Sequence, residues 1–444
     1  MPRSFLRNQT LRGLGPTTAQ LSQFRRRWET MAKAAQSASH GATQSRHATG
    51  PSRLKPLDAF GKNPGNLLAF AYAPENLPAG APLVVVLHGC TQDAAGYDAG
   101  SGWSTLADRH GFAVLYPQQQ AANNPNTCFN WFQPGNIRRG RGEALSIRQM
   151  VETMVERHGI DRSRIFVTGL SAGAAMTAAM LATYPDVFAA GAIIAGLPYG
   201  CAGNVQEALD SMFQGRERSA SEWGDRVRGA SSHQGPWPRV SVWHGSADAT
   251  VKPMNADETV KQWANVHGLD AKPTLRDKVD GFPRAAWVRD GETVLESYTI
   301  TGMAHGTPLG FTEGTEAVGA AGPYLLDVGI SSSERIAAFF GLADAADLRK
   351  AAPAKAEPAR EPAGASARPE AADPARNAAP ARKPTAAPRS EGTLPGGLHG
   401  EILPPLGDDE PEARDGPSSA GGIDVNAVIR NALRSAGLLK DEKR

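Results

Sequence analysis

The 444-residue chain carries 47 lysines and arginines against 45 aspartates and glutamates, so its formal net charge is +2. This near balance gives no electrostatic reason to expect a nucleic-acid partner. No apolar run approaches the roughly 20 residues of a membrane span, so we expect no integral membrane segment. The three cysteines, Cys90, Cys128 and Cys201, are too few for a disulfide scaffold. They fit one bridge with one free thiol, or three free thiols in a reducing compartment.

Residues 1–53 are interpreted as an N-terminal extension. The first residues lack the continuous apolar core of a secretory signal. Thr17 or Thr18 can cap an amphipathic helix, whose apolar side carries Leu21, Phe24, Trp28 and Met31. We favour a helix packed against the main domain over one that binds a membrane surface or a partner.

Residues 54–342 alternate between strand and helix patterns. The pattern predicts strands over residues 67–73, 83–88, 112–117, 165–167, 189–195, 240–243 and 294–300, and helices over residues 103–110, 143–158, 174–182, 255–267 and 336–340. We expect Pro117 to stop its strand and Gly159 to end its helix. The alternation predicts an α/β fold with a mostly parallel sheet covered by helices on both faces.

Two long segments interrupt this alternation. Residues 118–142 are irregular and rich in amides, and long segments of this kind inside compact domains are more often functional than idle. Their aromatic pair, Trp131 and Phe132, is predicted either to line a substrate pocket or to close the core. Residues 203–237 are polar and are predicted to form an irregular cap or lid.

Residues 169–173, Gly-Leu-Ser-Ala-Gly, fit the G-x-S-x-G pattern between a strand and a helix. This context is required of a nucleophile elbow, in which a tight turn exposes the serine hydroxyl above a helix N-terminus. A side chain at Gly169 or Gly173 would collide with neighbouring backbone. Ser171 is therefore the predicted nucleophile.

A serine nucleophile needs a base, and the base needs an orienting carboxylate. Parallel strands present the loops after their carboxyl ends at one edge of the sheet. Asp248 follows the strand over 240–243, and His305 follows the strand over 294–300. The order Ser171, Asp248, His305 is that of the α/β-hydrolase fold.

Other histidines and aspartates are alternative candidates for these roles. His244 precedes Asp248, so its order is wrong for the base, and we expect it to brace the turn. The remaining rivals are His88 at a strand end, His267 late in a helix, Asp290 in an Asp-Gly hairpin turn and Asp257 on a helix.

Residues 88–92, His-Gly-Cys-Thr-Gln, come directly after a strand that precedes the elbow. In folds with this elbow, the loop at that position provides the first N–H donor of the oxyanion hole. The amides of Cys90 and Ala172 are therefore the predicted oxyanion hole. Cys90 also fits a plain buried small residue. No metal-ligand spacing is present, and the chemistry requires neither metal nor cofactor.

Residues 343–421 are dominated by alanine, proline, glutamate, arginine and glycine, and predict a disordered linker. Residues 422–444 predict a short amphipathic helix capped by Asp424. Because such a helix is marginal alone, we expect it to dock on its own domain, a second copy or a partner.

Together these motifs resemble the polyhydroxybutyrate depolymerase family of esterases, which acts on short-chain-length polyhydroxyalkanoates. The matching segments span residues 55–342 and are residues 87–92, 128–132, 141–143, 169–173, 196–201, 244–248 and 305–308. The resemblance implies the α/β-hydrolase fold, the triad Ser171, Asp248 and His305, and an oxyanion hole at Cys90. It also makes Cys128 and Cys201 candidates for a bridge near the site.

The resemblance implies a serine esterase that cleaves short-chain poly(3-hydroxyalkanoate) polymer or oligomers. The same family includes feruloyl and acetylxylan esterases, which are the first alternative. A non-catalytic binding or tethering protein is the second. Depolymerases of this type are extracellular and usually carry a signal peptide and a polymer-binding domain. Neither is visible here, so a cytoplasmic location is the alternative, and oligomers, amorphous polymer or another ester remain candidate substrates.

Overall fold

The computed structural model describes residues 52–311 and 317–344. The predicted helices of the N-terminal extension and of residues 422–444 lie outside the described residues, as does the linker from residue 345 onward. The predicted domain boundaries therefore remain predictions.

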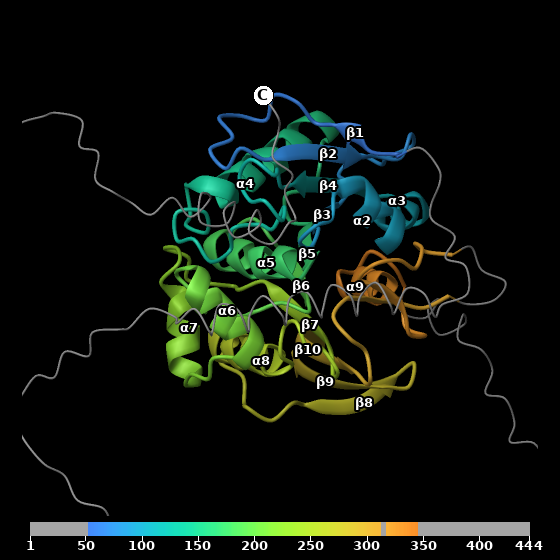
Figure 1. The fold of residues 1–444 in the computed structure, drawn as a ribbon. Coiled ribbons are helices and arrows are strands. Elements are labelled where there is room, and N and C mark those ends of the chain that lie inside the picture. The colour runs from blue at the N-terminus through green and yellow to red at the C-terminus, as the bar shows by residue number, and fades with distance from the viewer. Residues whose placement is uncertain (1–51, 312–316, 345–444) are drawn as a thin grey trace, which may run out of the picture. The chain divides into compact units, whose positions relative to one another are not determined.

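A ten-stranded sheet runs through the described domain in the order β1-β2-β4-β3-β5-β6-β7-β10-β9-β8 (Figure 1). The strands are β1 (Lys55–Pro56), β2 (Leu68–Tyr72), β3 (Leu83–Leu87), β4 (Ala113–Gln118), β5 (Ile165–Leu170), β6 (Ala190–Ile194), β7 (Arg239–Gly245), β8 (Leu275–Val279), β9 (Phe282–Arg289) and β10 (Glu292–Ile300). The central strands from β4 to β10 pair in parallel, whereas the strands at both edges pair antiparallel. A separate parallel pair joins β11 (Thr307–Leu309) to β12 (Leu325–Asp327).

Helices cover both faces of this sheet. They are α2 (Ala94–Ser101), α3 (Trp103–His110), α4 (Gly142–His158), α5 (Ala172–Thr183), α6 (Val205–Gln214), α7 (Ala220–Arg228), α8 (Met254–His267) and α9 (Ser332–Phe339). One buried cluster joins the sheet to α4, α5, α6, α7 and α8, and a second joins its other face to α2, α3 and α9. The predicted α/β fold with two covered faces is confirmed.

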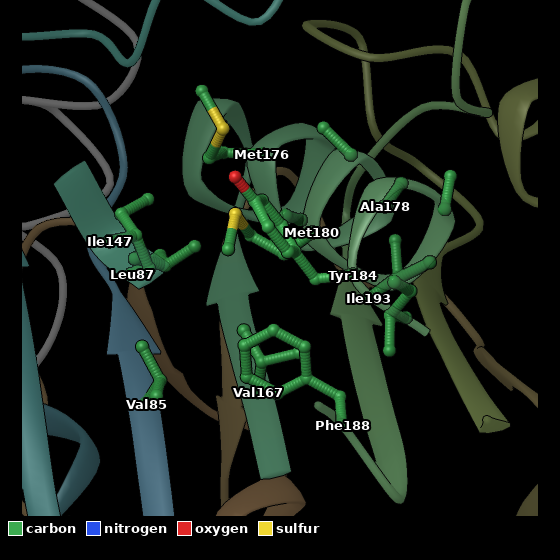
Figure 2. Packing of buried hydrophobic residues seen from close by; sticks show 14 of the residues in the cluster. Val85, Leu87, Ile147, Val167, Met176, Ala178, Met180, Tyr184, Phe188 and Ile193 are labelled. Atoms are coloured by element: carbon green, nitrogen blue, oxygen red, sulfur yellow. The ribbon is translucent and has the colours of Figure 1, made fainter. Parts of the chain in front are cut away.

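The central strands are buried on both faces, which explains why continuous apolar runs in the sequence predicted them. In β3, Val85 and Leu87 enter one cluster while Val84 and Val86 enter the other, so every position is apolar. Figure 2 shows Leu87, Val167 and Ile193, from three neighbouring strands, beneath Met176 and Met180 of α5. The alanines of α5 let this helix lie close to the sheet, and all of its residues are buried. The helix that begins directly after Ser171 is therefore firmly anchored.

Two predicted features differ in the structure. Pro117 does not stop β4, which continues to Gln118. The pairing of β4 with β3 ends at Leu115, whereas its pairing with β2 continues to Gln118, so the missing N–H group of Pro117 interrupts no hydrogen bond to β3.

The 203–237 segment is not irregular, because it contains α6 and α7. The side chain of Asn204 caps α6 by accepting from the Glu207 amide, and Ser219 with Glu222 forms a capping box on α7. The Asp290-Gly291 hairpin turn predicted from sequence is confirmed between β9 and β10, with both residues at positive φ.

Candidate active site

Ser171 occupies the turn between β5 and α5. Its backbone has φ 57° and ψ −115°, a region that a non-glycine residue rarely enters and that costs about 1–3 kcal/mol. The Ser171 amide donates to the Ile194 carbonyl at 2.9 Å, which ties the turn to the end of β6. The side chain is largely buried, with 9% of the residue exposed. This is the strained strand-to-helix turn expected of a nucleophile elbow.

Two glycines make the turn possible. A Cβ atom on Gly169 would lie 2.6 Å from the backbone of Gly173, and one on Gly173 would lie 2.2 Å from the Leu87 carbonyl oxygen and 2.5 Å from that of His88. Backbone atoms cannot yield to such contacts without moving the chain. The first turn of α5 therefore packs directly against the end of β3, where the 88–92 loop begins.

Asp248 and His305 meet, although 57 residues separate them. His305 Nδ1 lies 2.7 Å from Asp248 Oδ2, and the side chains are 8% and 0% exposed. Asp248 Oδ1 accepts from the amides of Thr250 and Val251 at 2.8 and 2.9 Å. Burial acts to raise the pKa of Asp248, but its contacts with His305 and His244 outweigh burial and hold that pKa well below its ordinary value. Asp248 is therefore an ionised carboxylate that holds one nitrogen of His305.

The loops that carry Asp248 and His305 are in backbone contact. A Cβ on Gly245, the last residue of β7, would lie 2.2 Å from the Met303 carbonyl oxygen. The Ala247 amide donates to the same carbonyl at 3.0 Å, and the Ser246 amide donates to the Ile300 carbonyl at 3.0 Å. The Asp248–His305 pair thus rests on two adjacent strand ends of the parallel sheet.

The 88–92 loop is attached to the irregular segment that follows β4. Cys90 and Cys128 form a disulfide, and the Thr91 amide donates to the Asn126 carbonyl at 2.7 Å. The suggested Cys128–Cys201 bridge is therefore wrong. Cys201 is a buried free thiol beside α6, where the Ser211 hydroxyl donates to its carbonyl, and burial raises its pKa to about 12.

A series of buried hydrogen bonds also joins the 88–92 loop to the irregular segment. The Gln119 amide donates to His88 Nε2 at 3.1 Å, so His88 carries its proton on Nδ1, which lies 2.7 Å from the Gly89 carbonyl oxygen. Gln119 Nε2 in turn donates to Glu143 Oε1 at 2.7 Å, and Glu143 also accepts from the amide and side chain of Asn130. Burial raises the pKa of Glu143 to about 7 against these donors. Burial also lowers the pKa of His88 to about 4, so that ring is a neutral brace.

The predicted aromatic pair lies beside this network. Trp131 belongs to the large core cluster. The ring of Phe132 packs edge-on against the ring of Trp131, with ring centroids 5.6 Å apart and an interplanar angle of 89°. The burial of Trp131, at 7% exposed, fits the core-closing alternative as well as it fits a pocket wall.

The alternative histidines and aspartates, with one exception, lie away from this pair. His267 ends α8 with Nε2 3.0 Å from the Pro238 carbonyl oxygen, and Asp290 lies in the hairpin turn. Asp257 lies on α8, where burial raises its pKa. His244 is the exception, because its Nε2 lies 3.3 Å from Asp248 Oδ2. This contact was not predicted, and the four-residue spacing between His244 and Asp248 across a turn was its one sequence signal.

No group of three or more His, Cys, Asp or Glu side chains among residues 52–311 and 317–344 is arranged to bind a metal ion. Every helix in the described part of the chain is too short or too polar to cross a bilayer.

Known proteins resemble this chain in sequence and in fold. The family model described as "Esterase PHB depolymerase" matches residues 68–279. Poly(3-hydroxyalkanoate) depolymerase C of Paucimonas lemoignei is 54% identical over 291 residues, which cover 65% of this chain and 70% of that protein. Acetylxylan esterase of Coprinopsis cinerea is 37% identical over 286 residues, or 61% and 75% of the two proteins.

Among solved structures, acetyl xylan esterase from Aspergillus awamori matches with a TM-score of 0.55 and 30% identity, over 65% of this chain and 99% of that chain. The resemblance drawn from the motifs is confirmed. Since the first relative is more than half identical over most of its own length, the chain belongs to the PHB depolymerase family of esterases and is a carboxylic ester hydrolase of the α/β-hydrolase fold.

Proposed function

We propose that this esterase uses Ser171 as nucleophile, His305 as general base and Asp248 as the orienting carboxylate. The observation that carries the assignment is the buried 2.7 Å contact between His305 Nδ1 and Asp248 Oδ2. The carboxylate fixes the tautomer with the proton on Nδ1, so Nε2 has a lone pair available for a proton. The strained turn at Ser171 and the order of the three residues support the same assignment.

The reaction proceeds through an acyl-enzyme. His305 Nε2 takes the Ser171 hydroxyl proton as Oγ bonds to the ester carbonyl carbon, and the carbonyl oxygen becomes an oxyanion. The intermediate collapses when the ester C–O bond breaks and His305 returns the proton to the leaving alcohol. Water then repeats the sequence, losing its proton to His305 and releasing the carboxylic acid and free Ser171.

The amides of Cys90 and Ala172 are proposed to stabilise the oxyanion. Support comes from the close packing between Gly173 and the backbone of Leu87 and His88, which holds the start of α5 beside the 88–92 loop. Removing one such donor typically costs about 10²–10³ in kcat. Trp131 and Phe132 are proposed to form an apolar wall near the acyl group, because the irregular segment that carries them is bonded to the same loop.

We assign the substrate class as short-chain poly(3-hydroxyalkanoate), polymer or oligomer. The similarity to the Paucimonas depolymerase supports this class. The Cys90–Cys128 bridge supports an oxidising compartment, in agreement with an extracellular location. The docking role of residues 422–444, on the same chain or on a partner, is part of the same proposal.

Acetylated xylan is the second candidate substrate, because the Coprinopsis and Aspergillus esterases match much of the chain. Purified protein assayed on 3-hydroxybutyrate oligomers, acetylated xylan and methyl ferulate separates the possibilities by kcat/KM. A preference for hydroxybutyrate oligomers is the expected result. A higher kcat/KM on acetylated xylan or on methyl ferulate would replace the proposed substrate and leave the triad assignment unchanged.

The triad is tested without reference to a natural substrate. A fluorophosphonate probe should label the wild type and fail to label Ser171→Ala and His305→Ala. Asp248→Asn should lower kcat by about 10⁴, by analogy with the loss of the triad carboxylate in serine proteases. Asp290→Asn is the matched control and should stay near wild type, because Asp290 lies in a tight turn between strands. Labelling of Ser171→Ala would reject the nucleophile, and damage greater at Asp290 than at Asp248 would reject the carboxylate.

A further inference from the structure

A second histidine contacts the carboxylate of Asp248. His244 lies on β7, where 3% of the residue is exposed. Its Nε2 lies 2.8 Å from the Val251 carbonyl oxygen and 3.3 Å from Asp248 Oδ2. The same Oδ2 is the atom that contacts His305 Nδ1 at 2.7 Å. One carboxylate oxygen therefore lies between two imidazole rings.

The partners of His244 fix its tautomer. A carbonyl oxygen and a carboxylate oxygen both accept, so Nε2 must carry the hydrogen and divide it between them. Nδ1 is buried and has no hydrogen-bond partner within the part of the chain that the structure describes. A proton on Nδ1 would thus be buried without an acceptor, at a considerable free-energy cost. His244 therefore presents its Nε2–H group to Oδ2.

The two oxygens of Asp248 are secured differently. Oδ1 accepts from the amides of Thr250 and Val251, so its position follows from the turn itself. Within residues 52–311 and 317–344, Oδ2 has no backbone donor, and its contacts are with the two imidazoles. Without His244, the contact that remains to Oδ2 in this part of the chain is His305, on a separate loop.

We propose that His244 is a positioning residue for the hydrolytic reaction, which keeps Asp248 Oδ2 aimed at His305 Nδ1 through a donated Nε2–H hydrogen bond. The inference rests on the proposed triad and deepens it. His244 also donates to Val251, whose amide donates to Asp248 Oδ1, so one ring closes the turn around both carboxylate oxygens. It touches neither substrate nor Ser171 in this role and acts through Asp248 alone.

The test compares two substitutions at residue 244 with one in the same turn. His244→Phe keeps the ring shape and removes the donor, whereas His244→Gln can place an amide N–H near the position of Nε2. Ser246→Ala is the matched control, because Ser246 Oγ accepts from the Gly302 amide at 2.8 Å and so braces the same turn without reaching Asp248. For each full-length variant we would measure kcat and KM on a soluble short-chain ester, the rate of fluorophosphonate labelling and the melting temperature.

His244→Phe should lower kcat and the labelling rate together by at least about tenfold with KM little changed, the signature of an interaction that matters in the transition state. His244→Gln should recover most of that loss. The kcat of Ser246→Ala should stay within about twofold of the wild-type kcat, because the Ser246 side chain does not reach Asp248. A folded His244→Phe with wild-type kcat would overturn the proposal. So would equal losses in His244→Phe and Ser246→Ala, or a loss in Gln that matches the loss in Phe.

These outcomes are distinct from failure of the triad itself. If Ser171→Ala keeps its labelling or Asp248→Asn keeps its activity, the proposed function fails, whatever happens at His244. If those variants are inactive and folded His244→Phe is not, only the positioning role is lost. Should His244→Phe fail to fold, the comparison of His244→Gln with Ser246→Ala still decides. A positioning donor predicts that a folded His244→Gln keeps a kcat near that of wild type. A folded His244→Gln whose kcat falls well below that of Ser246→Ala would overturn the proposal.

Discussion

Removing the Cys90–Cys128 bridge should destabilise the protein strongly. The bridge closes a loop of 38 residues, and the chain-entropy relation for a loop of this length gives about 4 kcal/mol of stability. For a domain of this size such a loss lowers the melting temperature by roughly 7 °C. The double variant Cys90→Ala/Cys128→Ala should show this loss without leaving an unpaired thiol in the 88–92 loop.

The assay is thermal unfolding with and without a reductant. Reductant should lower the melting temperature of the wild type and leave the double variant unchanged. Cys201→Ala is the control, because this thiol is buried and unpaired, so its variant should keep the wild-type response to reductant. Thiol titration of the denatured, unreduced wild type should find one thiol. Three thiols, or a wild-type melting temperature that ignores reductant, would refute the reasoning.

Three other substitutions test the site and its support. Gly173→Ala should lower kcat/KM by about 10² or more, because its Cβ would lie 2.2 Å from the Leu87 carbonyl oxygen and displacements near 1 Å cost that much. Gly135→Ala, where a Cβ meets nothing within 4 Å, is the control, and equal esterase activity in the two variants would contradict the steric argument. His267→Gln should reduce the decrease in the free energy of unfolding that acid causes. Burial lowers the pKa of His267 to about 4. The unfolded state therefore binds more protons as pH falls from about 6.5 to about 4, and up to about 3 kcal/mol is lost over that window. The check is the melting temperature of both proteins measured between about pH 6.5 and pH 4. Melting temperatures that fall equally with pH in variant and wild type would contradict this prediction. Ser219→Ala should cost about 1 kcal/mol in urea unfolding by removing the α7 cap, and an unchanged midpoint would show that the cap contributes little.

The parts of the structure that sequence could predict are those with one dominant physical constraint. Strands β3 and β5 were readable because both faces are buried, so nearly every position is apolar. The Ser171 turn was readable because only glycine fits where its backbone meets Leu87. The pairing of Asp248 with His305 followed from the rule that parallel strands present their loops at one edge.

The rest depends on neighbours that are distant in sequence. Strand β8 is charged and half-exposed, and only its pairing with β9 makes it a strand. The partner of Cys128 is decided by where the segment after β4 folds, and the Thr91–Asn126 hydrogen bond brings that segment to Cys90. The contact between His244 and Asp248 required the exact course of a turn, which spacing alone leaves open.

The backbone contact at Gly245 has a consequence for redesign of this scaffold. The ends of β7 and β10 press against each other so closely that residues 245–251 and 301–306 form a single module, whereas Ser171 is supplied by β5, on the far side of β6. An exchange of loops between homologues would have to transplant both segments of that module together. The serine turn, in contrast, would have to be transferred with β5, α5 and the end of β3, because the carbonyl groups of Leu87 and His88 lie against Gly173.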